Sequence, residues 1–223
     1  MLITQDIETG PNPTASLIIL HGLGADGSDF VPFCGELTLD EVGPVRFVLP
    51  SAPVRRVSLN NGYPMQAWYD ILPVSGPRRE DEASLREAHV LVMWLIEREM
   101  ARGIPSDRIV LMGFSQGCAM TLMTGLRCPH PLAGLVALSG YLPLADTTAS
   151  ERHAANLRTP IFMAHGSEDD VVSITRGAAA RDALVQLGHE VSWHSYPMDH
   201  SLCMAEVDDL HAWVAERLRT AGA

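Results

Sequence analysis

Residues 110–120 read VLMGFSQGCAM, and this stretch decides how the rest of the chain is interpreted. An apolar run ends at Gly113, a serine follows two residues later, and Gly117 comes two residues after the serine. The residues before the motif are typical of a buried strand, and those after it are typical of a helix. A Gly-x-Ser-x-Gly motif between a strand and a helix predicts a sharp bend that lifts the serine hydroxyl clear of the sheet. We therefore predict that Ser115 is a nucleophile at a helix N-terminus, where the helix dipole favours developing negative charge.

Short apolar segments alternate with longer helical patterns along most of the chain. Such alternation predicts an α/β fold with a mostly parallel central sheet and helices on both faces. The expected strands are Ser16–Leu20, Val45–Leu49, Arg108–Met112, Gly134–Leu138, Pro160–Ala164 and Glu190–Tyr196. The expected helices are Ala83–Arg102, Ser115–Leu126, Ile174–Leu187 and Met204–Leu218. The residues before Ser16 are expected to add an antiparallel edge strand, and the 223 residues are predicted to form one domain, 1–223.

Composition excludes several classes of function. The net charge of −11, from 16 basic and 27 acidic residues, disfavours nucleic acid as a partner, because phosphate binding depends on Lys and Arg. The longest apolar-rich segment, His89–Ile96, is too short to cross a bilayer, so no integral membrane association is expected. The four cysteines have the spacing of neither a disulfide framework nor a zinc site. Without a secretory signal pattern at the N-terminus, the chain is expected to be cytoplasmic.

A nucleophilic serine requires a histidine base and an acid that orients the histidine. In this architecture both follow the serine in chain order, at the carboxyl ends of later strands. Of the histidines after Ser115, only His200 falls in the loop between the last expected strand and the terminal helix. The acid is expected in HGSEDDVV, which offers Glu168, Asp169 and Asp170, and position alone does not choose among them.

Stabilisation of an oxyanion is predicted from two backbone N–H groups. One belongs to Gln116, the residue after the nucleophile, and the other is expected in a loop after an early strand. That loop reads HGLGADGSDF, where Gly22 and Gly24 allow close approach and leave the N–H of Leu23 as the donor. His21 is expected to brace the loop by hydrogen bonding. Residues 50–82 interrupt the alternation with prolines, glycines and aromatic residues, which indicates a functional or covering loop.

Taken together, HGLGADGSDF, RFVLPSAP, NGYPMQAWYDI, MGFSQG, HGSEDDVV and YPMDH resemble the phospholipase/carboxylesterase family, which includes bacterial carboxylesterases and acyl-protein thioesterases. The resemblance implies an α/β-hydrolase fold with little or no cap domain and hydrolysis of acyl esters or thioesters without a cofactor or metal. By match to the family's motifs it implies a triad of Ser115, His200 and Asp169, with Leu23 and Gln116 as oxyanion donors. Beside these, it implies an acyl channel lined by Met65, Trp68 and Tyr69.

The leading functional hypothesis is a serine carboxylesterase that hydrolyses short-to-medium acyl esters through an acyl-enzyme intermediate. The alternative is an acyl-protein thioesterase or lysophospholipase that acts on longer acyl chains. A rival from another class is a binding protein with this fold and no turnover, which the complete set of motifs disfavours. The expected partner is a small acyl ester or thioester substrate, and formation of a homodimer stays open at this level.

Overall fold

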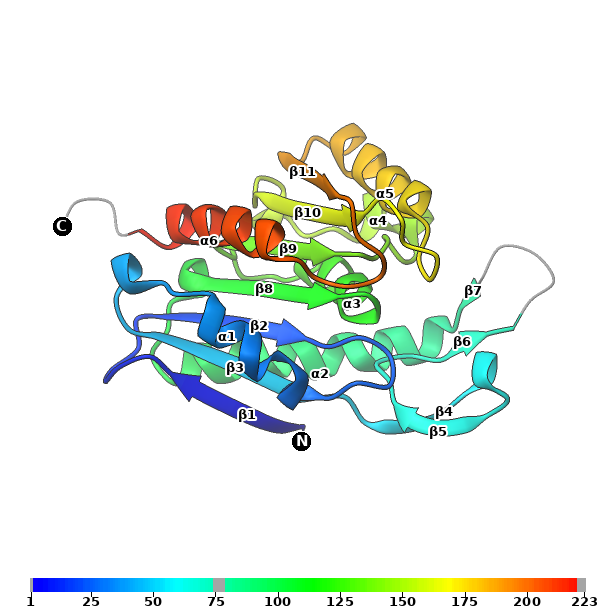
Figure 1. Ribbon diagram of the computed structural model, residues 1–223, viewed down its shortest axis with the longest axis horizontal. Coiled ribbons are helices and arrows are strands. Elements are labelled where there is room, and N and C mark those ends of the chain that lie inside the picture. The colour runs from blue at the N-terminus through cyan, green and yellow to red at the C-terminus, as the bar shows by residue number, and fades with distance from the viewer. Residues whose placement is uncertain (1, 74–78, 220–223) are drawn as a thin grey trace.

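A seven-stranded sheet forms the centre of the computed structural model, which describes residues 2–73 and 79–219. Its strand order is β1-β3-β2-β8-β9-β10-β11, and only β1 runs antiparallel to its neighbour (Figure 1). The strands are β1 (Ile3–Glu8), β2 (Ala15–Leu20), β3 (Val45–Ser51), β8 (Ile109–Phe114), β9 (Gly134–Leu138), β10 (Ile161–Gly166) and β11 (Val191–Tyr196). The mostly parallel sheet and the antiparallel edge strand are thereby confirmed.

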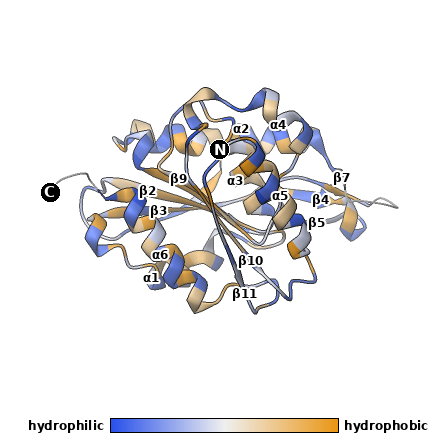
Figure 2. Cartoon of the chain, turned by 90° about the horizontal axis from the view of Figure 1, so that it is seen from above, coloured by the Kyte–Doolittle hydropathy of each residue, from blue (hydrophilic) through white to orange (hydrophobic). Residues whose placement is uncertain are grey.

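Helices cover both faces of the sheet because its inner strands are apolar on both sides. All six residues of β2 are buried. Leu17 and Ile19 pack on one face, whereas Ile18 and Leu20 pack on the other. In Figure 2, α1 and α6 lie on one side of the strands, and α2 to α5 lie on the other. The helices are α1 (Val31–Glu36), α2 (Glu82–Ala101), α3 (Gln116–Gly125), α4 (Ala145–Glu151), α5 (Ile174–Gln186) and α6 (Met204–Leu218).

Among its described residues, the excursion between β3 and α2 contains two small hairpins where the sequence predicts only a loop. One pairs β4 (Val54–Val57) with β5 (Tyr63–Gln66), and the other pairs β6 (Ile71–Leu72) with β7 (Arg79–Glu80). Strands this short have no readable hydrophobic period, so the prolines and glycines dominate the sequence pattern. The hairpins lie at the carboxyl end of the sheet, beside the loops that follow β2 and β8 (Figure 1).

Two further expectations concern membranes and thiols. Among the helices in the described part of the chain, none is long and apolar enough to cross a membrane. The four cysteines are free thiols, as their spacing predicts: Cys34, Cys118, Cys128 and Cys203.

Candidate active site

The bend at Ser115 has the strained geometry that the glycine spacing predicts. Ser115 lies at φ +56° and ψ −115°, in a region that residues with side chains rarely adopt. A β-carbon on Gly113 would come within 2.2 Å of the Gly117 carbonyl carbon, and one on Gly117 within 2.0 Å of the Leu20 carbonyl oxygen. Only glycine fits at either position, so β8 can turn directly into α3 with the serine at its tip.

His200 connects Ser115 to an acid. Its Nε2 atom lies 2.8 Å from Ser115 Oγ, and its Nδ1 atom lies 2.7 Å from Asp169 Oδ2. A carboxylate only accepts, so Nδ1–H donates to Asp169 and the neutral ring presents an unprotonated Nε2 to the serine hydroxyl. The loops that carry the two residues meet at Gly166, where a β-carbon would come within 2.4 Å of the Met198 carbonyl oxygen.

Asp169 is held rigidly, which separates it from its acidic neighbours. Its Oδ1 atom accepts hydrogen bonds from the backbone N–H groups of Val171 at 2.9 Å and Val172 at 2.8 Å. Asp169 is buried, while Glu168 and Asp170 are exposed. His165 Nε2 lies 3.4 Å from Asp169 Oδ2 and donates to the Val172 carbonyl. Burial lowers the pKa of His165, which keeps this second ring neutral beside the carboxylate.

The loop after β2 lies directly against the serine. A β-carbon on Gly22 would approach the Ser115 β-carbon to 3.3 Å, and Leu23 lines both of the cavities that Ser115 borders. Gln116 is the first residue of α3, where backbone N–H groups have no partner within the helix. His21 braces the loop with both ring nitrogens: Nδ1–H donates to the Gly22 carbonyl at 2.7 Å, and Nε2 accepts from the Ala52 N–H at 2.9 Å.

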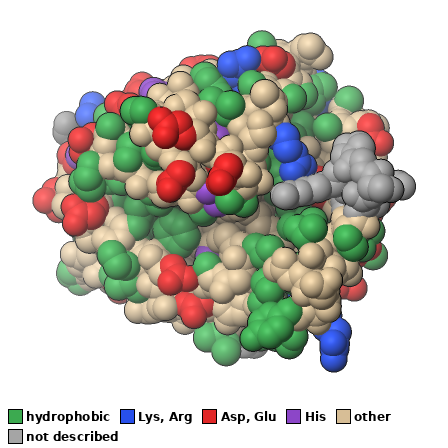
Figure 3. Space-filling view, turned by 45° about the vertical axis from the view of Figure 1, so that its right-hand side comes forward, with side chains coloured by type: hydrophobic (Ala, Val, Ile, Leu, Met, Phe, Trp, Pro, Cys, Tyr) green, Lys and Arg blue, Asp and Glu red, His purple; other side chains and the backbone are tan. Residues whose placement is uncertain are grey.

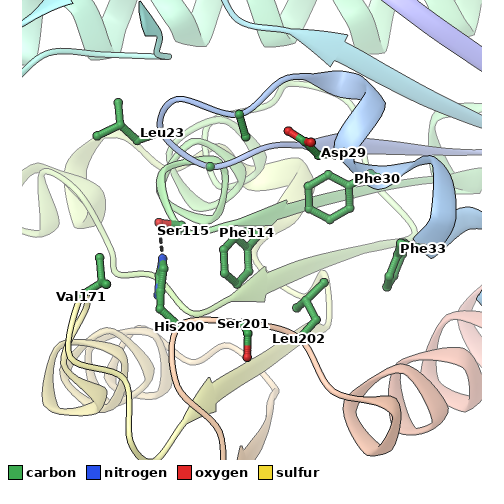
Figure 4. Close-up of a pocket in the computed structure, with 12 residues that line it drawn as sticks. Leu23, Asp29, Phe30, Phe33, Phe114, Ser115, Val171, His200, Ser201 and Leu202 are labelled. Carbon is green, nitrogen blue, oxygen red and sulfur yellow. Dashed lines mark hydrogen bonds between the residues drawn. The ribbon is translucent and has the colours of Figure 1, made fainter. Parts of the chain in front are cut away.

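Two cavities meet at Ser115. The larger has a volume of about 500 Å³, and the smaller has a volume of about 210 Å³. Figure 4 shows the larger cavity, with Ser115 and His200 joined at its edge and aromatic rings on one side of them. The larger cavity is lined by Gly22, Leu23, Ala25, Asp29, Phe30, Phe33, Phe114, Ser115, Val171, His200, Ser201 and Leu202. The smaller is lined by Leu23, Leu59, Asn60, Tyr69, Ile71, Ser115, Gln116, Tyr141, Val171, Val172 and Arg176. In Figure 3, this side of the molecule is hollowed, a histidine is visible in the hollow, and acidic side chains stand on both sides of it.

The three residues expected to line an acyl channel are placed differently from one another. Tyr69 borders the smaller cavity. Met65 also lines neither cavity: its sulfur lies 3.7 Å from a β-carbon position on Gly24 and accepts from the Asn60 amide, so Met65 supports the loop after β2. Trp68 lines neither cavity, because its indole lies beneath that loop and donates to the His21 carbonyl, and the expectation for Trp68 is therefore corrected.

Sequence reasoning also missed most of the apolar wall. Phe30 and Phe33 pack edge to face with ring centroids 5.8 Å apart. The ring centroids of Phe114 and His200 are 4.8 Å apart. The signal for Phe30 and Phe33 was present in DFVPF, where two aromatic residues three positions apart stand at the end of the HGLGADGSDF loop. Tyr141 carried no such signal, because its place beside the serine depends on the turn after β9.

A family model described as phospholipase/carboxylesterase matches residues 5–217. The chain belongs to this family. It is 41% identical over 217 residues to acyl-protein thioesterase 1 of Neurospora crassa, covering 92% of this chain and 87% of the relative. It is 36% identical to acyl-protein thioesterase 1 of Yarrowia lipolytica, with coverage of 92% and 93%.

Solved structures agree with the family assignment. The crystal structure of Arabidopsis thaliana SOBER1 superposes with a TM-score of 0.84 at 31% identity, over 92% of this chain and 99% of that one. Esterase PE8 superposes with a TM-score of 0.83 at 28% identity, over 96% of this chain and 98% of that one. The fold is therefore that of an α/β-hydrolase, and the protein is a serine hydrolase.

Proposed function

We propose that this hydrolase cleaves the thioester or ester bond between a long acyl chain and its carrier, with Ser115 as the nucleophile. The observation that carries the proposal is the line of hydrogen bonds from Ser115 through His200 to Asp169, at the point where two cavities meet. The four free thiols suit a reducing compartment, so the cytoplasm is the proposed place of action.

The reaction proceeds in two halves. Ser115 Oγ attacks the carbonyl carbon while His200 Nε2 takes the hydroxyl proton, and the N–H groups of Leu23 and Gln116 bind the resulting oxyanion. The intermediate collapses with loss of the thiol or alcohol, which receives that proton from His200. Water then attacks the acyl-enzyme and gives a proton to the same nitrogen, which passes it to Ser115 Oγ as the bond to the acyl group breaks and the carboxylic acid leaves. Asp169 orients the imidazole and stabilises its charged form throughout.

We infer the roles of the two cavities from the position of the base. His200 must protonate the leaving group, so the leaving group lies on the side of Ser201 and Leu202, in the larger cavity. The acyl chain then extends into the smaller cavity, past Tyr69 and Ile71. The lining of this smaller cavity includes the apolar side chains of Leu59, Ile71 and Val172, and such a lining suits a hydrocarbon chain because burial of each methylene group is favourable by about 0.8 kcal/mol.

Thioester hydrolysis is supported by the names of two relatives, each called acyl-protein thioesterase 1, at 41% and 36% identity. A second candidate, an esterase for short-to-medium acyl chains, is supported by the structural likeness to esterase PE8. The two candidates share the same chemistry and differ in the substrate that is turned over fastest.

Two measurements test the proposal. A fluorophosphonate should label the protein at Ser115, located by mass spectrometry of the digested adduct; labelling elsewhere, or none in a preparation that turns over, rejects the nucleophile. The ratio kcat/KM should then be measured for oxoesters and thioesters from acetyl to palmitoyl. A maximum at long thioesters supports the first candidate, whereas a maximum at or below octanoyl oxoesters supports the second.

A further inference from the structure

Trp68 lines neither of the two cavities at Ser115 and is bound instead to the backbone of the loop after β2. Its side chain is 0% exposed, and its indole N–H donates to the backbone carbonyl of His21 at 2.9 Å. The ring lies 5.3 Å from the His21 ring, centroid to centroid. A β-carbon on Gly117 would come within 2.8 Å of the same His21 carbonyl oxygen. That carbonyl is therefore confined between the start of α3 and the indole, directly before the loop that carries Leu23.

The hydrogen bonds of His21 fix the direction of the Leu23 N–H. The Gly22 carbonyl and the Leu23 N–H belong to one planar trans peptide, in which the two groups point in opposite directions. Because His21 Nδ1–H holds that carbonyl at 2.7 Å, it also determines where the N–H points. The His21 ring is in turn set by the Ala52 N–H on Nε2, and burial lowers the pKa of His21, which favours the neutral ring that this pattern needs.

Gln116, which carries the second oxyanion donor, is also hydrogen-bonded to Trp68. The side chain of Gln116, 3% exposed, accepts from the Trp68 backbone N–H at 2.7 Å and donates to the Tyr69 carbonyl at 2.8 Å. Gln116 thus uses its amide to clamp the 68–69 backbone and leaves its own backbone N–H for the site. A continuous set of buried hydrogen bonds runs from the Leu23 peptide through His21 and Trp68 to Gln116.

We propose that Trp68 is a positioning residue that aligns the two halves of the oxyanion hole, through its indole N–H on the Leu23 side and its backbone N–H on the Gln116 side, and makes no contact with the acyl chain. The Gln116 amide and the His21 ring complete the same alignment. The inference rests on the proposed function, because an oxyanion hole has a role only if the enzyme forms a tetrahedral intermediate. A displaced N–H donor binds the oxyanion of the transition state less well, whereas the uncharged substrate carbonyl depends on it less. The substitution should therefore lower kcat.

The test replaces Trp68 with Phe, which retains an aromatic ring and removes the indole N–H. We expect kcat to fall roughly 10- to 100-fold, less than or equal to the loss for removal of one whole oxyanion donor, with KM within about twofold. Affinity for an alkylboronic acid, which forms a tetrahedral adduct on the serine, should fall by the same factor as kcat/KM. Trp213→Phe makes the same replacement on α6, where the indole packs against Gly134 at the amino end of β9, and should leave kcat unchanged.

Other outcomes overturn the inference. A raised KM with an unchanged kcat would make Trp68 a substrate contact, and unchanged kinetics and boronate affinity would remove the indole N–H from the alignment. If Trp68→Phe does not fold, incorporation of 3-benzothienylalanine, which replaces the N–H with sulfur at nearly the same shape, gives the same readouts. A wild-type protein that neither turns over esters nor reacts with a fluorophosphonate would refute the proposed function instead.

Discussion

The α-carbon of Gly117 faces the backbone of Leu20 so closely that a β-carbon there would lie 2.0 Å from the Leu20 carbonyl oxygen. Leu20 ends β2, and Gly117 is the second residue of α3, so this contact joins the strand before the oxyanion loop to the helix after Ser115. The nucleophile and the loop opposite it are therefore positioned by one backbone contact that admits no side chain.

Replacement of Gly117 with Ala should consequently damage both stability and activity. Backbone atoms of β2 cannot move aside without disrupting the centre of the sheet, so we expect a loss of at least about 3 kcal/mol in the free energy of unfolding. Chemical denaturation and ester hydrolysis provide the measurements. Gly35→Ala in α1 is the control, because no atom beyond its chain neighbours and the backbone of its own helix lies within 4 Å of its β-carbon position, and it should stabilise the fold by about 0.4–1 kcal/mol. If Gly117→Ala and Gly35→Ala had the same free energy of unfolding and the same activity, the close contact between Gly117 and Leu20 would not be essential.

Asp169 and Asp170 should respond very differently to the same substitution. Asp169 accepts the His200 Nδ1–H at 2.7 Å from a buried position, whereas the Asp170 side chain is exposed. Asp169→Asn should lower kcat by about 10⁴-fold, since an amide can hold the wrong tautomer of the imidazole. Asp170→Asn should change kcat less than about twofold, as surface substitutions usually do. A larger effect at Asp170, measured with one ester at saturation, would reverse the assignment.

The parts of this site that the sequence could predict are those whose interacting residues lie close together along the chain. The bend at Ser115 is encoded locally, because Gly113 and Gly117 are needed within five consecutive residues. His200 could be selected from chain order alone, whereas the choice among Glu168, Asp169 and Asp170 needed either the family resemblance or the geometry. The deciding feature, two N–H groups of the following turn bound to Asp169, has no signature beyond the carboxylate itself.

Trp68 shows where sequence reasoning fails. An aromatic residue in a polar, turn-rich segment can face a cavity or the core, and composition is the same in both cases. Its burial depends on β2 and α3, which are distant in sequence. The short hairpins around it were missed for the same reason, because two- and four-residue strands are specified by their partners.

The two cavities should control different parts of the substrate. Ile71→Phe narrows the smaller cavity and should lower kcat/KM for octanoyl esters far more than for acetyl esters that share one leaving group. The expected discrimination is about 1–3 kcal/mol for each methylene group that no longer fits. Phe33→Ala opens the larger cavity and should change the ranking of leaving groups in acetyl esters, with the acyl-length profile unaltered. A crossed pattern, in which Phe33→Ala alters only the acyl profile, would exchange the two assignments.

Glu206 should make the stability of the fold depend on pH. This residue lies in the first turn of α6 with 1% exposure, and burial raises its pKa from 4.5 to about 8, against a smaller opposite effect of the Cys203 N–H. Between these values the unfolded chain releases the proton while the folded protein retains it. The free energy of unfolding therefore falls as pH rises from 4.5 to about 8, with at most about 1.4 kcal/mol for each unit of pKa difference.

Glu206→Gln removes this dependence and retains the shape of the side chain. The variant should melt at the same temperature as the wild type near pH 4.5 and several degrees higher near pH 8, since each kcal/mol shifts the melting temperature by about 2–4 °C at this chain length. Glu216→Gln on the same helix is the control: the Glu216 side chain is 62% exposed, and its contact with Arg217 should contribute little at either pH. Calorimetry of the three proteins across this range measures the difference. A gain for Glu206→Gln that is equal at both pH values would show that its carboxyl does not change charge within the range.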